Sequence, residues 1–275
     1  MKQPKIFIII PSCNGKKFLK ECLVSLFNIT WPYYQVIIVD NASTDGLPVM
    51  VKKHFPKVVM IVNKKNMGFA TACNQGAKVA QGEILFFLNS DTLIQESVFQ
   101  RIIETFKANP NIGIVAPQLV LPDGSLQPWA YGKKEGFCHL VKNKFYPVSA
   151  PSIKYPNTQS LMWVSGAAMA IRREIFEKIG GFDEKFFMYF EDKDLCYRVK
   201  ELGYKIVINN EVKVVHFVGK SPILNRDRKK IYYQAQNHYW RKHYSLGSFI
   251  LMLFIRWPYK FYILHMKINQ NLICF

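Results

Sequence analysis

Short apolar runs and helical repeats alternate along the first 110 residues of this 275-residue chain. Runs rich in β-branched and aromatic side chains predict buried strands at residues 5–10, 34–40, 58–63 and 82–89, and Pro11 is expected to end the first of them. Between these runs, apolar residues recur at helical spacing and predict helices at residues 16–28, 47–54, 68–80 and 96–108. This alternation implies an α/β fold in which helices flank a mostly parallel sheet.

The pattern changes in the second half of the chain. Many proline and glycine residues between residues 120 and 160 predict long loops, which in a compact domain usually serve binding or closure. A later apolar run at residues 212–215 predicts a strand that ends at His216. A lone histidine there is typical of a structural residue, and it becomes a candidate metal ligand only if the fold brings it beside Asp91.

Polar side chains follow three of the predicted strands: Ser12 and Asn14, then Asp40 and Asn41, then Asn89 to Asp91. Ligands of parallel sheets bind beyond the carboxyl ends of the strands, so these side chains are candidates for gripping a nucleotide. Asp40 can accept hydrogen bonds from a base, and Asp91 can coordinate a divalent cation. Each residue alone is more typical of a turn or a cap, but three such groups favour a binding site.

An acidic cluster, Glu191, Asp192 and Asp194, stands among aromatic residues in a chain of net charge +18. Burial beside aromatic surface raises the proton affinity of a carboxylate, which suits a general base. The alternative interpretation is that Glu191 and Asp194 occupy the first turn of a helix, where the helix dipole favours acids.

The C-terminal residues 219–275 have a composition of their own. They contain ten Lys and Arg but one acid, Asp227, which gives +9, half of the net charge, together with many Tyr and Trp residues. Such a segment suits either single-stranded nucleic acid or an anionic membrane surface. Its longest uncharged stretch, residues 244–255, falls short of the roughly 20 residues that span a bilayer, so we expect a peripheral membrane foot.

The six cysteines form no Cys-x-x-Cys pair and mostly stand in apolar stretches, which predicts buried reduced thiols and a cytosolic location. The apolar run near Met1 is too short for a signal peptide. The first strand is followed by a single glycine rather than by Gly-x-Gly-x-x-Gly, Val214 stands where a phosphate loop before Gly219-Lys220-Ser221 needs glycine, and Gly-x-Ser-x-Gly does not occur. These patterns disfavour a dinucleotide enzyme, a P-loop enzyme and a serine hydrolase.

Taken together, seven segments of this chain resemble family 2 glycosyltransferases of the GT-A fold, especially the bacterial rhamnosyltransferase-like branch. The segments keep the order of that family between residues 5 and 220. They are Ile-Ile-Ile-Pro-Ser-Cys-Asn-Gly at 8–15, Val-Ile-Ile-Val-Asp-Asn-Ala-Ser-Thr-Asp-Gly at 36–46, residues 66–76, Phe-Leu-Asn-Ser-Asp-Thr at 87–92, Val-Ser-Gly-Ala at 164–167, residues 180–198 and His216.

The resemblance implies a role for each matching residue. Asp91 would hold Mg²⁺ or Mn²⁺ on the donor diphosphate, His216 would support it, and Asp192 would be the catalytic base. Asn89 stands where the family's metal motif has its first acid, which leaves one carboxylate fewer for the metal. The implied nucleotide-sugar residues are Pro11, Ser12, Asn14, Asp40, Asn41, Asn66, Gly68, Asn74, Asn89 and Asp91. The implied acceptor residues are Trp163, Gly166 and Glu191, although Trp163 suits the core equally well.

We therefore expect an inverting, metal-dependent glycosyltransferase domain at residues 1–220 and a basic, aromatic, helical, membrane-associating extension at residues 221–275. The expected donor is dTDP-L-rhamnose, and the expected acceptor is lipid-linked or a polysaccharide, at the cytoplasmic face of the cell membrane. The alternatives are another sugar from a UDP donor, such as galactofuranose or N-acetylglucosamine, a nucleic-acid-binding protein, and an inactive binding module. No nucleic acid partner is expected, and the oligomeric state is not predicted.

Overall fold

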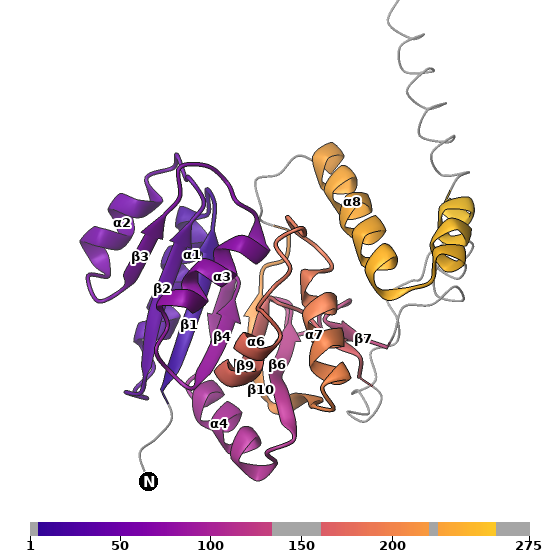
Figure 1. Cartoon of the computed structure of the whole chain (residues 1–275). Helices are drawn as coiled ribbons and strands as arrows, with labels where there is room; N and C mark the ends of the chain where they lie inside the picture. Colours follow the sequence, from indigo (N-terminus) through magenta and orange to yellow (C-terminus); the bar gives the residue numbers. More distant parts are fainter. Residues whose placement is uncertain (1–4, 134–160, 220–224, 257–275) are drawn as a thin grey trace, which may run out of the picture.

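A computed structural model describes residues 5–133, 161–219 and 225–256 and contains a sheet of eight strands (Figure 1). The strand order is β3-β2-β1-β4-β9-β6-β10-β5, and only β9 and β5 run antiparallel to their neighbours, so the predicted mostly parallel sheet is confirmed. The strands are β1 (Ile6–Ser12), β2 (Tyr34–Asp40), β3 (Val59–Val62), β4 (Ile84–Leu88), β5 (Thr92–Ile94), β6 (Ile112–Val120), β9 (Ala168–Arg172) and β10 (Lys205–His216).

Helices cover both faces of this sheet because alternate residues of each strand point to opposite sides. In β1, Ile6, Ile8 and Ile10 enter the core under α1, α2 and α4, whereas Phe7 and Ile9 enter the core under α3, α6 and α7. The helices are α1 (Lys16–Phe27), α2 (Leu47–His54), α3 (Phe69–Val79), α4 (Val98–Ala108), α6 (Arg173–Lys178) and α7 (Glu191–Glu201). The predicted helices of the first half therefore form with small shifts at their ends.

Pro11 does not end the first strand, contrary to the sequence-based expectation. The Ser12 carbonyl accepts a hydrogen bond from Asn41 on the β2 side, so the nitrogen of Pro11, one residue earlier, faces β4. Pairing between β1 and β4 has already stopped at Ile9 and Phe87. The missing N–H of Pro11 therefore costs the sheet no hydrogen bond.

Several elements of the second half were not predicted. These are strands β6 and β9, helix α6, and the first half of β10, which begins at Lys205 rather than at residue 212. The segment predicted as long loops contains β7 (Tyr131–Gly132), which pairs with β8 (Trp163–Val164) in a second small sheet. The rest of that predicted loop, residues 134–160, lies outside the described residues.

The described part of the C-terminal extension, residues 225–256, is helical, as predicted, and it packs beside α7 (Figure 1). Helix α8 (Asn225–His243) is followed by a helical segment at residues 246–256. Ala235, Tyr239, Trp240, Phe249 and Met252 form a third apolar cluster with Phe186 and Phe190 of the loop before α7. Across the described residues, no helix has the length and apolar character needed to cross a bilayer. The division of the chain at residue 220 stays a prediction.

Ion pairs add to this packing on both sides of the turn that begins α7. Asp183 receives hydrogen bonds from His238 Nε2 at 3.0 Å and from Lys242 Nζ at 2.8 Å. Asp194 lies 2.8 Å from the same Lys242 Nζ and 2.7 Å from His243 Nε2. The extension is therefore tied to the segment that carries the acidic cluster.

Candidate active site

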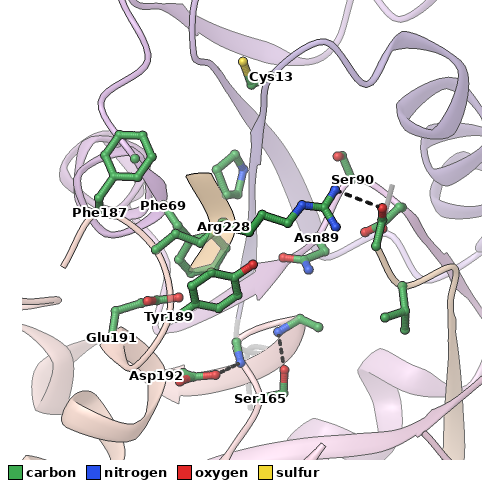
Figure 2. Close-up of a pocket in the computed structure, with 18 of the residues that line it drawn as sticks. Cys13, Phe69, Asn89, Ser90, Ser165, Phe187, Tyr189, Glu191, Asp192 and Arg228 are labelled. Atoms are coloured by element: carbon green, nitrogen blue, oxygen red, sulfur yellow. Dashed lines mark hydrogen bonds between the residues drawn. The ribbon is translucent and has the colours of Figure 1, made fainter. Parts of the chain in front are cut away.

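A cavity of about 900 Å³ opens beyond the carboxyl ends of the central strands, between the first turn of α7 and helix α8 (Figure 2). This is the edge where ligands of open α/β sheets bind. Of the fifteen site residues predicted from the sequence, twelve line this cavity, and they come from seven separate segments of the chain. They are Pro11, Ser12, Asn41, Asn66, Gly68, Asn89, Asp91, Trp163, Gly166, Glu191, Asp192 and His216.

Asn14, Asp40 and Asn74 do not line this cavity. Asp40 is fully buried and its two carboxylate oxygens accept the Ser43 N–H at 3.3 Å, which shapes the turn after β2. The carboxamide of Asn74 makes two 2.9 Å hydrogen bonds, one to the N–H and one to the carbonyl of Phe182. These residues hold loops around the cavity, and any direct contact with a ligand stays a prediction.

Asn14 has a left-handed backbone, with φ of 50°, and its side-chain oxygen accepts the Thr44 N–H at 2.7 Å. It therefore joins the turn after β1 to the turn after β2.

The fold brings Asp91 and His216 together, although 125 residues separate them in the sequence. His216 Nε2 lies 3.1 Å from Asp91 Oδ1, and His216 Nδ1 lies 2.8 Å from the Gln127 carboxamide oxygen. A carboxamide oxygen only accepts, so Nδ1 carries the hydrogen and a neutral ring directs the Nε2 lone pair toward the carboxylate. Two acceptors at this distance are stabilised when a cation lies between them, and one oxygen and one nitrogen donor suit a divalent ion.

Asn89 lies beside this pair, and its side-chain nitrogen is 3.3 Å from His216 Nε2. The residue that replaces the family's first acid therefore supplies a hydrogen-bond donor instead of a negative charge. Among the described residues, no group of three or more His, Cys, Asp and Glu side chains could hold a metal ion. Asp91 and His216 would thus supply two ligands, and a bound ion would need further ligands from a substrate or from water.

Asp192 is held at the cavity by two backbone donors. Its Oδ2 accepts the Gly166 N–H at 3.1 Å (Figure 2), and its Oδ1 accepts the Lys193 N–H at 2.8 Å. Burial raises the pKa of Asp192, and these hydrogen bonds oppose part of that rise. A carboxylate fixed in position with a raised pKa is suited to accept a proton.

Glu191 and Asp194 differ in their surroundings. Glu191 is 6% exposed, and its Oε2 has no hydrogen-bond partner among the described residues. Burial raises the pKa of Glu191 well above its usual range, and the charge of Asp192 raises it further. Although burial also raises the pKa of Asp194, hydrogen bonds and charges from His243, Arg198 and Lys242 outweigh it and lower that pKa. Asp194 therefore serves the docking of α8. All three acids lie in the first turn of α7, as the alternative interpretation expects of Glu191 and Asp194, and the role of Asp192 as a base stays a prediction.

A backbone contact joins two segments that line the cavity, residues 66–69 and residues 187–193. The Phe69 N–H donates to the Phe187 carbonyl at 2.7 Å, and a Cβ at Gly68 would lie 2.4 Å from that carbonyl oxygen. Tyr189 and Phe190 then adopt left-handed backbones with φ of 73° and 66°, a conformation that costs free energy in non-glycine residues. This strained turn delivers Glu191 and Asp192 to the cavity.

Trp163 belongs to the apolar core, as one of the two sequence-based interpretations expects, and it also lines the cavity. Its contact with an acceptor stays a prediction. The ammonium group of Lys193 lies 4.5 Å from the centre of its ring.

Several residues that line the cavity are not predictable from the sequence, above all Arg228 and Tyr232 of α8, together with Trp129 and Tyr189. The spacing of four between Arg228 and Tyr232 places them on one helix face. The direction of that face depends on how α8 docks, which no local pattern reveals.

Two family models match the chain. Residues 7–180 match the model described as glycosyl transferase family 2, and residues 148–218 match one described as N-terminal domain of galactosyltransferase. The first match covers most of the sheet and, of the cavity lining, the residues from Pro11 to Ala167.

Relatives and solved structures agree with this match. The chain is 29% identical over 225 residues to the N-acetylglucosaminyl-diphospho-decaprenol L-rhamnosyltransferase of Mycobacterium tuberculosis, covering 74% of this chain and 73% of that protein. It is 28% identical over 226 residues to the O-antigen biosynthesis protein RfbC of Myxococcus xanthus, covering 79% of this chain and 18% of that much longer protein. The mannosyltransferase PcManGT of Pyrobaculum calidifontis, solved with GDP-Man and Mn²⁺, superposes with a TM-score of 0.63 at 20% identity, covering 93% of this chain and 70% of that one. The predicted GT-A fold is confirmed by this likeness.

Proposed function

Because the chain belongs to glycosyl transferase family 2, it is a glycosyltransferase, and we propose that it moves a sugar from a nucleoside-diphosphate donor to an acceptor hydroxyl with inversion. The observation that carries the proposal is that Asp192 and the Asp91–His216 pair line the same cavity. Asp192 can accept a proton, and the Asp91–His216 pair lies at the edge of the sheet where nucleotides bind.

In this proposal Asp192 is the general base. The acceptor oxygen attacks the anomeric carbon while its proton passes to Asp192, and the bond from that carbon to the donor's phosphate oxygen breaks. The electron pair of the broken bond leaves with the nucleoside diphosphate. The hydrogen bonds from Gly166 and Lys193 keep the carboxylate oriented for this transfer. A single displacement inverts the anomeric configuration, by analogy with inverting glycosidases.

Asp91 and His216 would hold the divalent cation, Mg²⁺ or Mn²⁺. The ion supplies charge neutralisation on the diphosphate as the leaving group departs. Gln127 fixes the ring of His216 so that its Nε2 faces the ion, in the way that outer-sphere partners orient metal-binding histidines.

The proposed donor is dTDP-L-rhamnose, and the proposed acceptor is a lipid-linked or polysaccharide glycan. The similarity to a rhamnosyltransferase whose name gives a diphospho-decaprenol acceptor supports both choices. A UDP-linked sugar is the main alternative, because the cavity lining alone does not select a base. The test is a panel of dTDP-, UDP- and GDP-sugars with Mn²⁺ or with EDTA, scored by released nucleoside diphosphate. Release of dTDP from dTDP-rhamnose with Mn²⁺ but not with EDTA supports the proposal. Turnover of UDP-sugars without turnover of dTDP-rhamnose contradicts the donor assignment.

We also propose that the enzyme acts at the inner face of the cell membrane. The helical segment at residues 246–256 exposes an apolar face while Phe249 and Met252 on the opposite side are buried. The exposed face consists of Leu246, Ile250, Leu251 and Phe254, which are between 44% and 73% exposed. An apolar helix face in a basic extension suits the boundary between lipid headgroups and acyl chains.

A further inference from the structure

Helix α8 contributes a guanidinium group to the cavity. Arg228 lines it, and Figure 2 shows its side chain reaching from α8 across the cavity toward the side of Asn89 and Ser90. Its Nη2 donates to the Gly219 carbonyl at 3.3 Å. Gly219 is three residues beyond His216, so this contact holds the guanidinium beside the strand end that carries the proposed metal ligands.

The charges beside the end of β10 suit a positively charged protein side chain. Asp91 supplies the negative charge at this point, whereas Asn89 stands at the position of the family's first acid and directs its uncharged carboxamide nitrogen toward His216. A nucleoside diphosphate carries more negative charge than a single divalent ion neutralises at this point. A guanidinium presents a planar set of donors that matches phosphate oxygens, and it stays protonated throughout turnover.

We propose that Arg228 binds the diphosphate of the nucleotide donor and stabilises the leaving nucleoside diphosphate. This inference rests on the proposed function of the cavity. As the bond between the anomeric carbon and the phosphate oxygen breaks, that oxygen gains the electron pair, and Arg228 donates hydrogen bonds to the phosphate without losing a proton. The extension is then part of the donor site as well as a membrane foot, and Arg228 contacts the group that leaves.

The test compares nucleoside diphosphates with monophosphates, which differ in the phosphate that Arg228 is assigned to bind. Calorimetry with Mn²⁺ would measure dTDP and UDP against dTMP and UMP for the full chain and for Arg228→Met, Arg228→Lys and Lys229→Met. Lys229 is the exposed neighbour on α8, so its variant removes the same charge from outside the cavity. Thermal unfolding of each variant would report whether α8 stays docked.

We expect Arg228→Met to weaken the diphosphate about 10- to 100-fold, as loss of a charge-assisted hydrogen bond does, and to change the monophosphate by less than about threefold. Arg228→Lys should recover part of the loss, and Lys229→Met should bind like the wild type. Unchanged diphosphate affinity in Arg228→Met, or equal losses for both nucleotides, would overturn the assignment while leaving the glycosyltransferase proposal standing. A wild-type chain that binds none of these nucleotides would overturn both the assignment of Arg228 and the choice of a dTDP or UDP donor.

Discussion

Two adjacent carboxylates, Glu191 and Asp192, face the same cavity, and Asp192 is held by the N–H groups of two other residues, Gly166 and Lys193. We expect Asp192→Asn to lower kcat by about 10²–10⁴-fold, because the acceptor hydroxyl loses its base, while the affinity for nucleoside diphosphate is kept. Glu191→Gln is the matched control in the same turn. Steady-state kinetics and calorimetry on both variants would check this. Near wild-type turnover in Asp192→Asn would mean that Asp192 is not the general base, and loss of turnover in Glu191→Gln would then assign the base to Glu191.

If Asp192 is the base, its raised pKa predicts the pH dependence of the wild type. A base must be deprotonated to act, and a raised pKa keeps the proton bound to higher pH. We therefore expect kcat/KM to fall as the solution is acidified, with the acid limb above the ordinary Asp value of about 3.9. A profile measured with Mn²⁺ held constant and with protein unfolding monitored would show the limb, and a limb at or below that value would contradict the assignment.

Glu191 is expected to cost the protein stability at neutral pH. Its pKa is raised in the folded state, so its contribution to stability is present below the unfolded value of about 4.3 and is lost as the pH rises through the raised pKa. Glu191→Gln should therefore unfold at a higher temperature than the wild type at pH 7.5, and the difference should close toward pH 4. Asp194→Asn should do the opposite at pH 7.5, because it removes ion pairs to Arg198 and His243.

The sequence identified Asp91, Asp192 and His216 one by one, since each follows a recognisable strand or motif. It did not identify Gln127, which lies in a segment of turns and forms its hydrogen bond with a residue 89 positions later in the sequence, His216. Asp40 and Asn74 were expected to contact the nucleotide, but they do not line the cavity and their side chains bind backbone groups of other segments. Their contact with a ligand stays a prediction. Residue type and spacing show which side chains reach the sheet edge, but the tertiary fold decides which way each one turns.

At the scale of elements, strands β1, β2 and β4 are predictable because they are continuous apolar runs. Strand β9 is a short apolar run of five residues that ends at Arg172, and its place between β4 and β6 depends on antiparallel pairing with distant segments. Helix α8 has a polar sequence whose apolar contacts come from Phe186 and Phe190. Neither element carries a local signal strong enough to predict its position.

Helix α8 is fastened to the segment around α7 by Lys242, which lies 2.8 Å from both Asp183 and Asp194. We expect Lys242→Met to lower the melting temperature at pH 7, while Lys230→Met, an exposed site on the same helix, should leave it unchanged. Burial raises the pKa of Asp183, but hydrogen bonds from Lys242 and His238 outweigh it and hold that pKa below its usual range.

A lowered folded-state pKa contributes stability above the unfolded value of about 3.9, and that stability is lost as the pH falls through the folded value. The gap between the wild type and Lys242→Met should therefore narrow below pH 4. Differential scanning calorimetry across this range would check it, and a gap independent of pH would mean that the ion pairs do not fasten the helix.

At the scale of the whole molecule, the exposed apolar face at residues 246–256 should bind anionic vesicles. Replacing Leu246 and Phe254 by Ser should weaken co-sedimentation with vesicles that contain phosphatidylglycerol, because it removes apolar surface from the lipid boundary. Val49→Ser is the matched control, since Val49 is 72% exposed on α2, remote from the extension. Added salt should weaken wild-type binding through the basic residues. Binding to single-stranded RNA but not to vesicles would contradict the membrane assignment.

The backbone contact between Gly68 and Phe187 has a consequence for anyone who wishes to redesign this enzyme. At that point main-chain atoms fix the distance between the two segments that line the cavity, residues 66–69 and residues 187–193, so exchanging side chains cannot widen it. Even alanine at position 68 would force the two segments apart. The side of the cavity toward α8 is lined by side chains, among them Tyr232, which mutation can trim or enlarge. Libraries that seek a new sugar specificity should therefore vary Tyr232 and keep both Gly68 and Arg228, to which the donor diphosphate is assigned.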